Sequence, residues 1–204
     1  MSTKFIVALG YSEGGVEALK TFFDHTPHDQ ATYIILRHIP IAARSELHQV
    51  LKRYSKLTIV EAENNTDIKL DTVYIPPASS YIIIKNNKLF LIPRVEGMHL
   101  YNKSIDIFLE SLAKDKAEKS IAIIFSGVGD DGANGVTLIK KSGGMVIAQA
   151  PESCPYPEMP KNAIATGCVD HILLPAEMPK IVGEYVNPIL KKANGSDRLK
   201  GVAG

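Results

Sequence analysis

The fold of this chain is decided by the stretch Phe5-Ile6-Val7-Ala8-Leu9-Gly10-Tyr11-Ser12-Glu13-Gly14-Gly15. An unbroken apolar run ends in a turn rich in glycine, and apolar residues at helical spacing begin at Val16. Unbroken apolar runs are typical of strands that are buried on both faces of a parallel sheet. The stretch therefore predicts a strand that passes through a tight turn into a helix.

The same order of strand, turn and helix recurs along the 204 residues. Further strands are expected at 33–36, 57–60, 73–75, 121–125, 145–148 and 169–173. Apolar residues at helical spacing predict helices at 16–23, 47–54, 105–112, 136–139 and 176–186. This alternation predicts an α/β fold with a mainly parallel sheet that is covered on both faces. Two apolar runs that flank Lys85-Asn86-Asn87-Lys88 predict a hairpin at 81–92, expected as an antiparallel extension at one edge of the sheet.

The composition excludes several classes of function. The chain carries 23 basic and 22 acidic residues and shows no basic stripe with aromatics, so we expect no nucleic acid partner. No apolar run approaches the roughly 20 residues of a membrane span, and no signal peptide precedes the first strand, so we expect a cytoplasmic protein without membrane insertion. Neither the two cysteines, Cys154 and Cys168, nor the six histidines show metal-ligand spacing, so we expect no metal and no cofactor.

The chain is expected to form one domain at 4–186. Strands and helices alternate without a break over this range, and no internal repeat divides it. After Val186 the composition changes to lysine, glycine and small polar residues, which predicts a flexible tail or a linker at 187–204.

Three strand-end turns carry reactive groups, and ligands of open parallel sheets bind beyond the carboxyl ends of the strands. The first turn reads G-x-S-x-G from Gly10 to Gly14, a pattern that presents the hydroxyl of Ser12 near a helix N-terminus. On this motif alone, a helix-capping serine in a βα loop is an equally good interpretation.

The second turn places His38 just after a strand, where its imidazole is available as a general base, although a lone histidine is more often a hydrogen-bonded loop residue. The third turn, at 126–132, carries the acidic pair Asp130 and Asp131 between glycines. Adjacent strand ends lie about 5 Å apart, so the three turns can converge. Together they predict a nucleophile, a base and an orienting carboxylate.

Three other functions are compatible with parts of this pattern. In lipase-type α/β-hydrolases the catalytic residues follow the order Ser, acid, His along the chain. The order here is Ser12, His38, Asp131, which excludes that fold but not its serine chemistry. A nucleotide-binding domain is suggested by G-x-G-x-x-G at 127–132, but the acidic residue expected about 20 positions later is missing. A non-catalytic interaction module on the same fold is the third alternative.

At these turns the sequence resembles the catalytic domain of the chemotaxis protein-glutamate methylesterase family, CheB, over residues 4 to about 186. Residues 10–15 resemble the family's G-A-S-x-G-G turn, residues 37–40 its Q-H-M/L-x turn, and residues 126–132 its S/T-G-x-G-x-D-G turn. Further matches lie at 73–77, 104–106 and 159–163. The resemblance implies a three-layer α/β/α sandwich. The segments at 24–27 and 174–179 also resemble methylesterase domains that are joined to a methyltransferase in hybrid proteins.

The resemblance implies that Ser12 is the nucleophile, His38 the base and Asp131 the orienting acid. It implies hydrolysis of glutamate γ-methyl esters, with deamidation of glutamine in many members. The implied substrate is a methyl-accepting chemotaxis receptor or a similar methylated protein, with a methyltransferase as partner or fused domain. The backbone N–H groups of Glu13 and Val128 are expected to hold the oxyanion.

Several residues beside the expected site depart from the family pattern. Val128 stands where some members have methionine, and Glu13 and Asp130 add negative charge near the expected catalytic residues. Tyr11 replaces a small residue, usually alanine, and either crowds the cleft or points into the core. Arg37 replaces a common glutamine. It is either a partner for substrate carboxylates or, as we expect, a solvated charge at the strand end.

Overall fold

The computed structural model describes residues 4–40, 46–95 and 103–187. Its main sheet has seven strands in the order β10-β9-β8-β1-β2-β5-β3, and every neighbouring pair is parallel, which confirms the predicted parallel sheet. The strands are β1 (Ile6–Tyr11), β2 (Thr32–Arg37), β3 (Thr58–Glu61), β5 (Thr72–Ile75), β8 (Ser120–Ile124), β9 (Met145–Gln149) and β10 (His171–Leu173). β1 lies at the centre and is buried along its whole length, which explains its unbroken apolar sequence.

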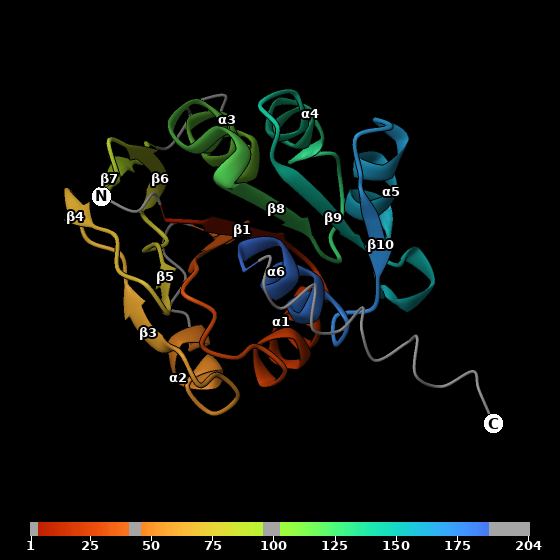
Figure 1. The fold of residues 1–204 in the computed structure, drawn as a ribbon, viewed down its shortest axis with the longest axis horizontal. Coiled ribbons are helices and arrows are strands. Elements are labelled where there is room, and N and C mark those ends of the chain that lie inside the picture. The colour runs from red at the N-terminus through yellow and green to blue at the C-terminus, as the bar shows by residue number, and fades with distance from the viewer. Residues whose placement is uncertain (1–3, 41–45, 96–102, 188–204) are drawn as a thin grey trace, which may run out of the picture.

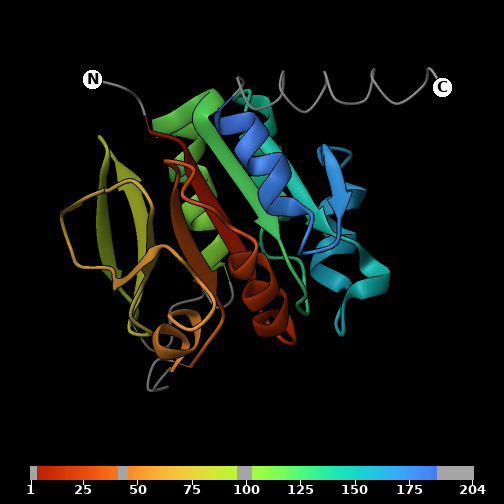
Figure 2. The ribbon, with the colours of Figure 1, turned by 60° about the horizontal axis from the view of Figure 1, so that its bottom comes forward.

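Helices cover both faces of this sheet, as Figures 1 and 2 show, so the three-layer α/β/α fold is confirmed. One face carries α1 (Gly15–Asp24), α2 (Leu47–Leu51) and α6 (Met178–Val186), and the other carries α3 (Ser104–Lys116), α4 (Ala133–Lys141) and α5 (Glu158–Ala165). Alternate residues of β1 serve the two cores, because successive side chains of a strand point to opposite faces. Val7 and Leu9 pack in the core that contains Phe22 of α1, whereas Ile6 and Ala8 pack in the core that contains Phe108 of α3.

The predicted hairpin is present, and its turn residues Asn86 and Asn87 have φ of 53° and 63°, in the left-handed region. Its strands are β6 (Ser80–Lys85) and β7 (Lys88–Pro93), which β4 (Thr66–Asp67) joins in a separate antiparallel sheet of order β4-β7-β6. We had expected the hairpin to extend one edge of the parallel sheet. It forms a separate sheet instead. Its apolar face, with Ile82 and Leu89, is buried in the core beside α3, so the hairpin completes a covering layer (Figure 1).

The chain changes its direction of winding at β1. β2 pairs with β1 on one side, whereas β8 pairs with it on the other. Gly10 in β1 lies opposite Leu36 in β2 and Ile124 in β8, so the three strands end at the same edge of the sheet. A crevice opens at such a point outside the carboxyl ends of the strands, and the fold thus brings the three reactive turns together.

The described elements run from β1 to the end of α6 at Val186. The tail expected at 187–204 lies outside the described residues except for Asn187, and it stays a prediction. Within the ranges that the structure describes, every helix is too short or too polar to cross a membrane.

Candidate active site

Ser12 lies directly after β1, at the start of α1. Its backbone N–H donates to the carbonyl of Ser126 at 3.0 Å, which ties the first turn to the third. Gly14 precedes α1 with φ of 74°, in the left-handed region that glycine adopts without strain. The turn therefore presents Ser12 at a helix N-terminus, as the G-x-S-x-G pattern predicts.

Glycine at position 127 allows the first and third turns to approach each other. A Cβ atom on Gly127 would lie 2.9 Å from Ser12 Cβ and 2.2 Å from Met159 Sδ. Both separations are shorter than carbon and sulfur atoms tolerate in a packed interior. Any side chain at this position would therefore displace Ser12 or the side chain of Met159.

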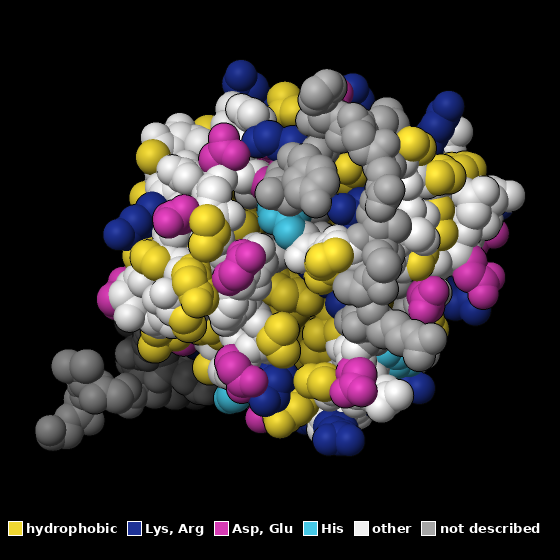
Figure 3. All heavy atoms as spheres, turned by 180° about the vertical axis from the view of Figure 1, so that it is seen from behind, with side chains coloured by type: hydrophobic (Ala, Val, Ile, Leu, Met, Phe, Trp, Pro, Cys, Tyr) yellow, Lys and Arg dark blue, Asp and Glu magenta, His cyan; other side chains and the backbone are white. Residues whose placement is uncertain are grey.

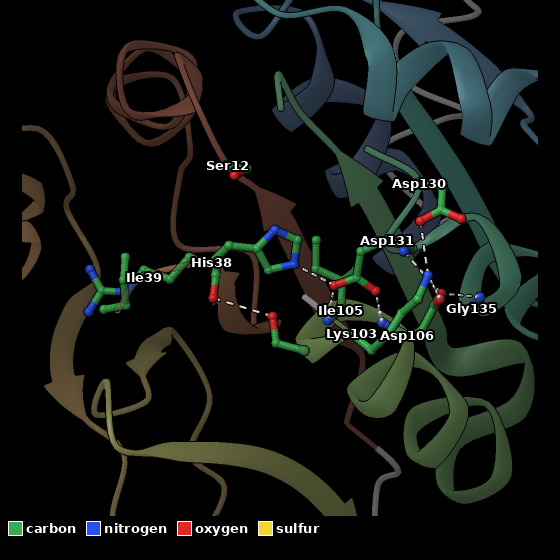
Figure 4. A network of polar contacts seen from close by, with 12 residues as sticks. Ser12, His38, Ile39, Lys103, Ile105, Asp106, Asp130, Asp131 and Gly135 are labelled. Atoms are coloured by element: carbon green, nitrogen blue, oxygen red, sulfur yellow. Dashed lines mark hydrogen bonds and ion pairs between the residues drawn. The ribbon is translucent and has the colours of Figure 1, made fainter. Parts of the chain in front are cut away.

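His38 and Asp131 come together from the ends of β2 and β8 (Figure 4). His38 Nε2 lies 2.6 Å from Asp131 Oδ2. The two side chains are only 12% and 1% exposed, so the contact is shielded from water, where a charge-assisted hydrogen bond is stronger. Of the acidic pair in the third turn, it is thus Asp131 that contacts the histidine.

Asp130, the other member of the acidic pair, has a different partner. Lys103 Nζ donates to Asp130 Oδ1 at 3.0 Å, and this hydrogen bond lowers the pKa of Asp130. The Asp130 side chain is 73% exposed. The third turn therefore sends one carboxylate toward His38 and the other toward a surface lysine (Figure 4).

Asp131 also binds the N-terminus of α3. Its Oδ2 accepts the N–H of Ile105 at 2.9 Å, and its Oδ1 accepts the N–H of Asp106 at 2.9 Å. The N–H groups at a helix N-terminus favour a negative charge. Together with His38, they hold both oxygens of this carboxylate in place within the folded protein.

The backbone on both sides of His38 is held by residues distant in the sequence. Arg94 Nη1 donates to the carbonyl of Ile39 at 2.8 Å. Ser104 Oγ donates to the carbonyl of Arg37 at 3.3 Å. Neither contact was predicted from the sequence, because each depends on how β7 and α3 pack beside the end of β2.

The hydroxyl of Ser12 does not bond to the imidazole. Its Oγ donates to Oε2 of Glu13, and among the described residues no hydrogen bond joins Ser12 to His38. Figure 4 shows the second ring nitrogen of His38, Nδ1, on the side of the ring that faces Ser12. Both residues line the same pocket. The structure thus brings Ser12 and His38 to one crevice without joining them.

The carboxylate of Glu13 occupies the space beside Ser12. Hydrogen bonds from the Ser12 hydroxyl and from the backbone N–H groups of Glu13 and Val128, together with the charge of His38, lower the pKa of Glu13. These two backbone groups are the ones expected to hold the oxyanion. The negative charge of Glu13 near the site was expected from the sequence, but its direct contact with the Ser12 hydroxyl was not.

Tyr11 points into the core. Its side chain is 5% exposed, and its ring lies so close to Gly15 that a Cβ there would be 2.7 Å away. Burial raises the pKa of Tyr11, while the charge of Arg37 and a hydrogen bond with it oppose the rise. Arg37 is therefore a partner of Tyr11, which differs from the solvated charge that we expected.

A pocket with a volume of 480 Å³ opens beside these groups. Its polar lining consists of Ser12, Glu13, Arg37, His38 and Glu46, and Val16, Leu47 and Val50 supply apolar wall from α1 and α2. Apolar walls with a few polar groups are typical of ligand-binding pockets. This arrangement can accept a side chain with an apolar stem and a carbonyl group.

The glycine-rich turn lacks the donors that a nucleotide needs. Its three glycine N–H groups already have protein acceptors: Gly127 binds the carbonyl of Tyr156 at 2.9 Å, Gly129 binds Glu158 Oε2 at 3.0 Å, and Gly132 binds Asp106 Oδ1 at 3.0 Å. A phosphate-binding loop presents such groups to the ligand, and carboxylates at the same place repel phosphate. The geometry therefore argues against the nucleotide-binding alternative.

The described residues contain no cluster of three or more His, Cys, Asp or Glu side chains that could hold a metal ion. On the face that Figure 3 shows, hydrophobic side chains gather near the middle and acidic and basic side chains are interspersed around them. This mixture agrees with the balanced composition of the chain. The expectation that no cofactor is needed stays a prediction.

Comparison with known proteins supports the family that the three strand-end turns resemble. The family model described as CheB methylesterase matches residues 7–182. Protein-glutamate methylesterase/protein-glutamine glutaminase 1 of Geobacter metallireducens is 31% identical over 88% of this chain and 50% of its own length. A putative protein-glutamate methylesterase/protein-glutamine glutaminase of Leptospira interrogans is 30% identical over 82% of this chain and 87% of its own length.

Among solved structures, the Thermotoga maritima CheB methylesterase catalytic domain is 30% identical, with a TM-score of 0.81. The match covers 90% of this chain and 99% of that one. The chain spans about half the length of several curated relatives it matches, including that of Geobacter metallireducens. The matched range includes all three strand-end turns, and the chain therefore belongs to the CheB methylesterase family.

Proposed function

We propose that this chain is a serine hydrolase that removes methyl groups from glutamate γ-methyl esters of chemoreceptor-type signalling proteins. The observation that carries the proposal is the 2.6 Å contact between His38 Nε2 and Asp131 Oδ2, beside the turn that presents Ser12. It supports Ser12 as the nucleophile, His38 as the base and Asp131 as the orienting acid. Membership in the family supports the ester substrate.

The reaction begins with transfer of the Ser12 proton. Because the Asp131 carboxylate accepts a hydrogen bond from Nε2, the neutral His38 ring carries its proton there, and Nδ1 accepts the proton of the attacking hydroxyl. Ser12 Oγ then adds to the ester carbonyl, and methanol leaves with the proton that His38 returns. Water attacks the resulting glutamyl-enzyme by the same route and releases the glutamate.

The Glu13 side chain has to leave Ser12 before this attack, because the Ser12 hydroxyl donates to it. Its departure frees the backbone N–H groups of Glu13 and Val128, which we propose as the oxyanion donors. The backbone N–H groups of Glu13 and Val128 lower the pKa of the Glu13 carboxylate, so they favour a negative charge at this place, which supports their role as oxyanion donors. Each such donor stabilises a transition state by about 3–4 kcal/mol.

We also propose deamidation of glutamine by the same residues. The names of the Geobacter metallireducens and Leptospira interrogans relatives include protein-glutamine glutaminase. A glutamine amide presents the same carbonyl, with ammonia as the leaving group in place of methanol. The proposed substrate is a methyl-accepting chemotaxis receptor or a similar methylated protein in the cytoplasm, and a methyltransferase is the proposed partner or fused domain.

Methanol release from a methylated receptor signalling domain tests this function. We expect Ser12→Ala to lower the rate by about 10,000-fold or more, because the nucleophile is lost. Ser79→Ala is the matched control, since Ser79 is an exposed serine that does not line the pocket, and it should keep the full rate. Equal release by the wild type and Ser12→Ala would refute the assignment.

A fluorophosphonate probe separates the remaining alternatives. The hydrolase predicts labelling at Ser12, and loss of labelling in His38→Ala. A non-catalytic module predicts no labelling of the wild type at all. Labelling at Ser12 without methanol release would instead indicate a serine hydrolase with another substrate. Activity should also be insensitive to EDTA, and its loss with chelator would contradict a metal-free mechanism.

A further inference from the structure

Two helix N-termini meet behind the His38–Asp131 pair, and an aspartate from each caps the other helix. Asp131, which precedes α4, accepts two N–H groups of α3. Asp106, in the first turn of α3, accepts the N–H groups of Gly132 at 3.0 Å and Gly135 at 2.7 Å at the start of α4. The two carboxylates therefore form a reciprocal pair of helix caps (Figure 4).

Asp106 supplies the cap that α4 cannot provide for itself. Gly132 stands at its N-cap position, with φ of 97°. A Cβ atom there would lie 2.9 Å from Ile124 Cδ1 and 3.0 Å from Ile105 Cγ2, so a side chain that caps the helix locally does not fit. An uncapped N-terminus leaves buried N–H groups without acceptors, which is costly. The acceptor therefore has to come from another element.

The charge of Asp106 is balanced locally. Lys103 Nζ lies 3.6 Å from Asp106 Oδ2 and 3.0 Å from Asp130 Oδ1. The Asp106 side chain is only 14% exposed. Burial raises the pKa of Asp106, as does the charge of Asp131, whereas the N–H of Gly135 and the charge of Lys103 lower it. Lys103 thus serves as the cation for this cluster of carboxylates.

We propose that Asp106 is a positioning residue for the reaction, acting through Asp131 and not by contact with the imidazole. This inference rests on the proposed function. Asp131 lies one residue before Gly132, so an anchor on the first turn of α4 fixes where the Asp131 carboxylate lies. That carboxylate in turn fixes His38 Nε2 at 2.6 Å. When the anchor is lost, the third turn shifts and the imidazole loses its fixed orientation.

Asp106→Ala tests the proposal, with Asp115→Ala as the matched control. Asp115 is also an aspartate of α3 that accepts two backbone N–H groups, those of Asn86 at 2.5 Å and Asn87 at 3.3 Å, but it does so in the distant hairpin. We expect Asp106→Ala to lower kcat by about 30- to 100-fold while KM changes less than about twofold, since misplacement by about 1 Å costs this much. Asp115→Ala should leave kcat within about twofold of the wild type.

Conservative variants distinguish positioning from general stability. Asp106→Asn keeps an acceptor oxygen for both N–H groups and should restore kcat to within about fivefold of the wild type. Asp106→Glu keeps the charge but lengthens the side chain, and should lose at least about tenfold in kcat. It serves as the decisive variant where Asp106→Ala does not fold. Wild-type kcat in either Asp106→Ala or Asp106→Glu would overturn the proposal.

The ¹⁵N shifts of the His38 imidazole give a readout that needs no substrate. We expect one neutral tautomer, protonated at Nε2, in the wild type and in Asp106→Asn, and a mixture of tautomers in Asp106→Ala. Because this measurement is independent of the ester, it separates failure of the positioning role from failure of the proposed function. A single Nε2 tautomer in Asp106→Ala would count against the role.

Discussion

The turn after β8 buries its carboxylate among donors from other elements, whereas the turn after β1 leaves its serine half-buried beside an adjacent residue. Asp131 is bound by His38, Ile105 and Asp106, which come from two other strand–helix units. The hydroxyl of Ser12 donates to Glu13, the next residue in the chain. One end of the proposed site is thus held by long-range contacts and the other by a local one.

The orientation of the His38–Asp131 pair and the availability of Ser12 therefore have different structural origins. The orientation of the His38–Asp131 pair is a property of the whole fold, because β2, α3 and α4 must all be in place to set it. The availability of Ser12 depends on one exposed side chain, that of Glu13, which rotates without disturbing the core. Changes in the turn after β8 should therefore alter both stability and rate, and changes in the turn after β1 should alter mainly rate.

The largest contrast is expected between Asp131→Ala and Ser12→Ala. Both should lower kcat by about 10,000-fold or more. Asp131→Ala should also lower the free energy of unfolding by about 2–4 kcal/mol, because it removes a helix cap and leaves buried N–H groups without an acceptor. Ser12→Ala should change it by less than about 0.5 kcal/mol. Urea denaturation measures the unfolding free energy of both variants. Equal losses would contradict the expected difference in stability between the two turns.

Gly127→Ala tests where the two turns touch. The new Cβ would press on Ser12 and on Met159, so we expect a loss of about 1–3 kcal/mol in the free energy of unfolding. The shift of Ser12 should also lower kcat/KM by about 10- to 100-fold.

Gly129→Ala is the control for this substitution, because nothing lies within 4 Å of a Cβ there. Its φ of 94° costs about 1–2 kcal/mol of backbone strain for alanine, without pressure on Ser12. Similar kcat/KM values for the two variants would show that the close approach at Gly127 does not position the nucleophile.

Glu13→Gln tests the local contact between the Glu13 carboxylate and the Ser12 hydroxyl. Replacing the carboxylate by a neutral amide weakens its hold on Ser12 and on the oxyanion donors, so kcat/KM for the methyl ester should rise about three- to tenfold. Glu17→Gln in α1 is the control, since it removes an exposed charge that pairs with Lys20, and should leave kcat/KM unchanged. A fall in kcat/KM for Glu13→Gln would show that the carboxylate assists the reaction.

Glu13 also predicts a small pH effect on stability. Its pKa is lowered in the folded protein, so its hydrogen bonds stabilise the fold above the ordinary pKa of 4.5 and lose this effect as the pH falls through the lowered value. Wild type and Glu13→Gln should therefore converge in unfolding free energy at acidic pH. A difference between them that grows below pH 4.5 would contradict this sign.

The smallest effect is expected far from both turns, at Gly183 in α6. A Cβ there would meet nothing within 4 Å, and alanine favours a helix over glycine by about 0.5–1 kcal/mol. Gly183→Ala should raise the thermal unfolding temperature slightly and leave kcat/KM unchanged. A change in rate would show that the α6 layer contributes to the site.

The local signals in the sequence predicted the parallel sheet, the covering helices, the hairpin and the three strand-end turns. These features depend on apolar periodicity and on glycine or asparagine at tight turns, which act within a few neighbouring residues. The separate small sheet was not predicted, because nothing in the hairpin itself distinguishes packing by its face from pairing at its edge. The partner of Arg37 was missed for a similar reason, since Tyr11 reaches it from the neighbouring strand.

The sequence by itself placed Ser12, His38 and Asp131 at strand ends, because a strand, its turn and its helix are contiguous in the chain. The family resemblance implied which carboxylate of the acidic pair meets the imidazole, and the structure places that carboxylate there. Only the tertiary structure decided which side chain rests on Ser12 and how Asp106 and Asp131 cap each other's helices. These contacts join residues up to 93 positions apart. Their geometry depends on the order of the strands and the packing of α3 against α4, which no local pattern encodes.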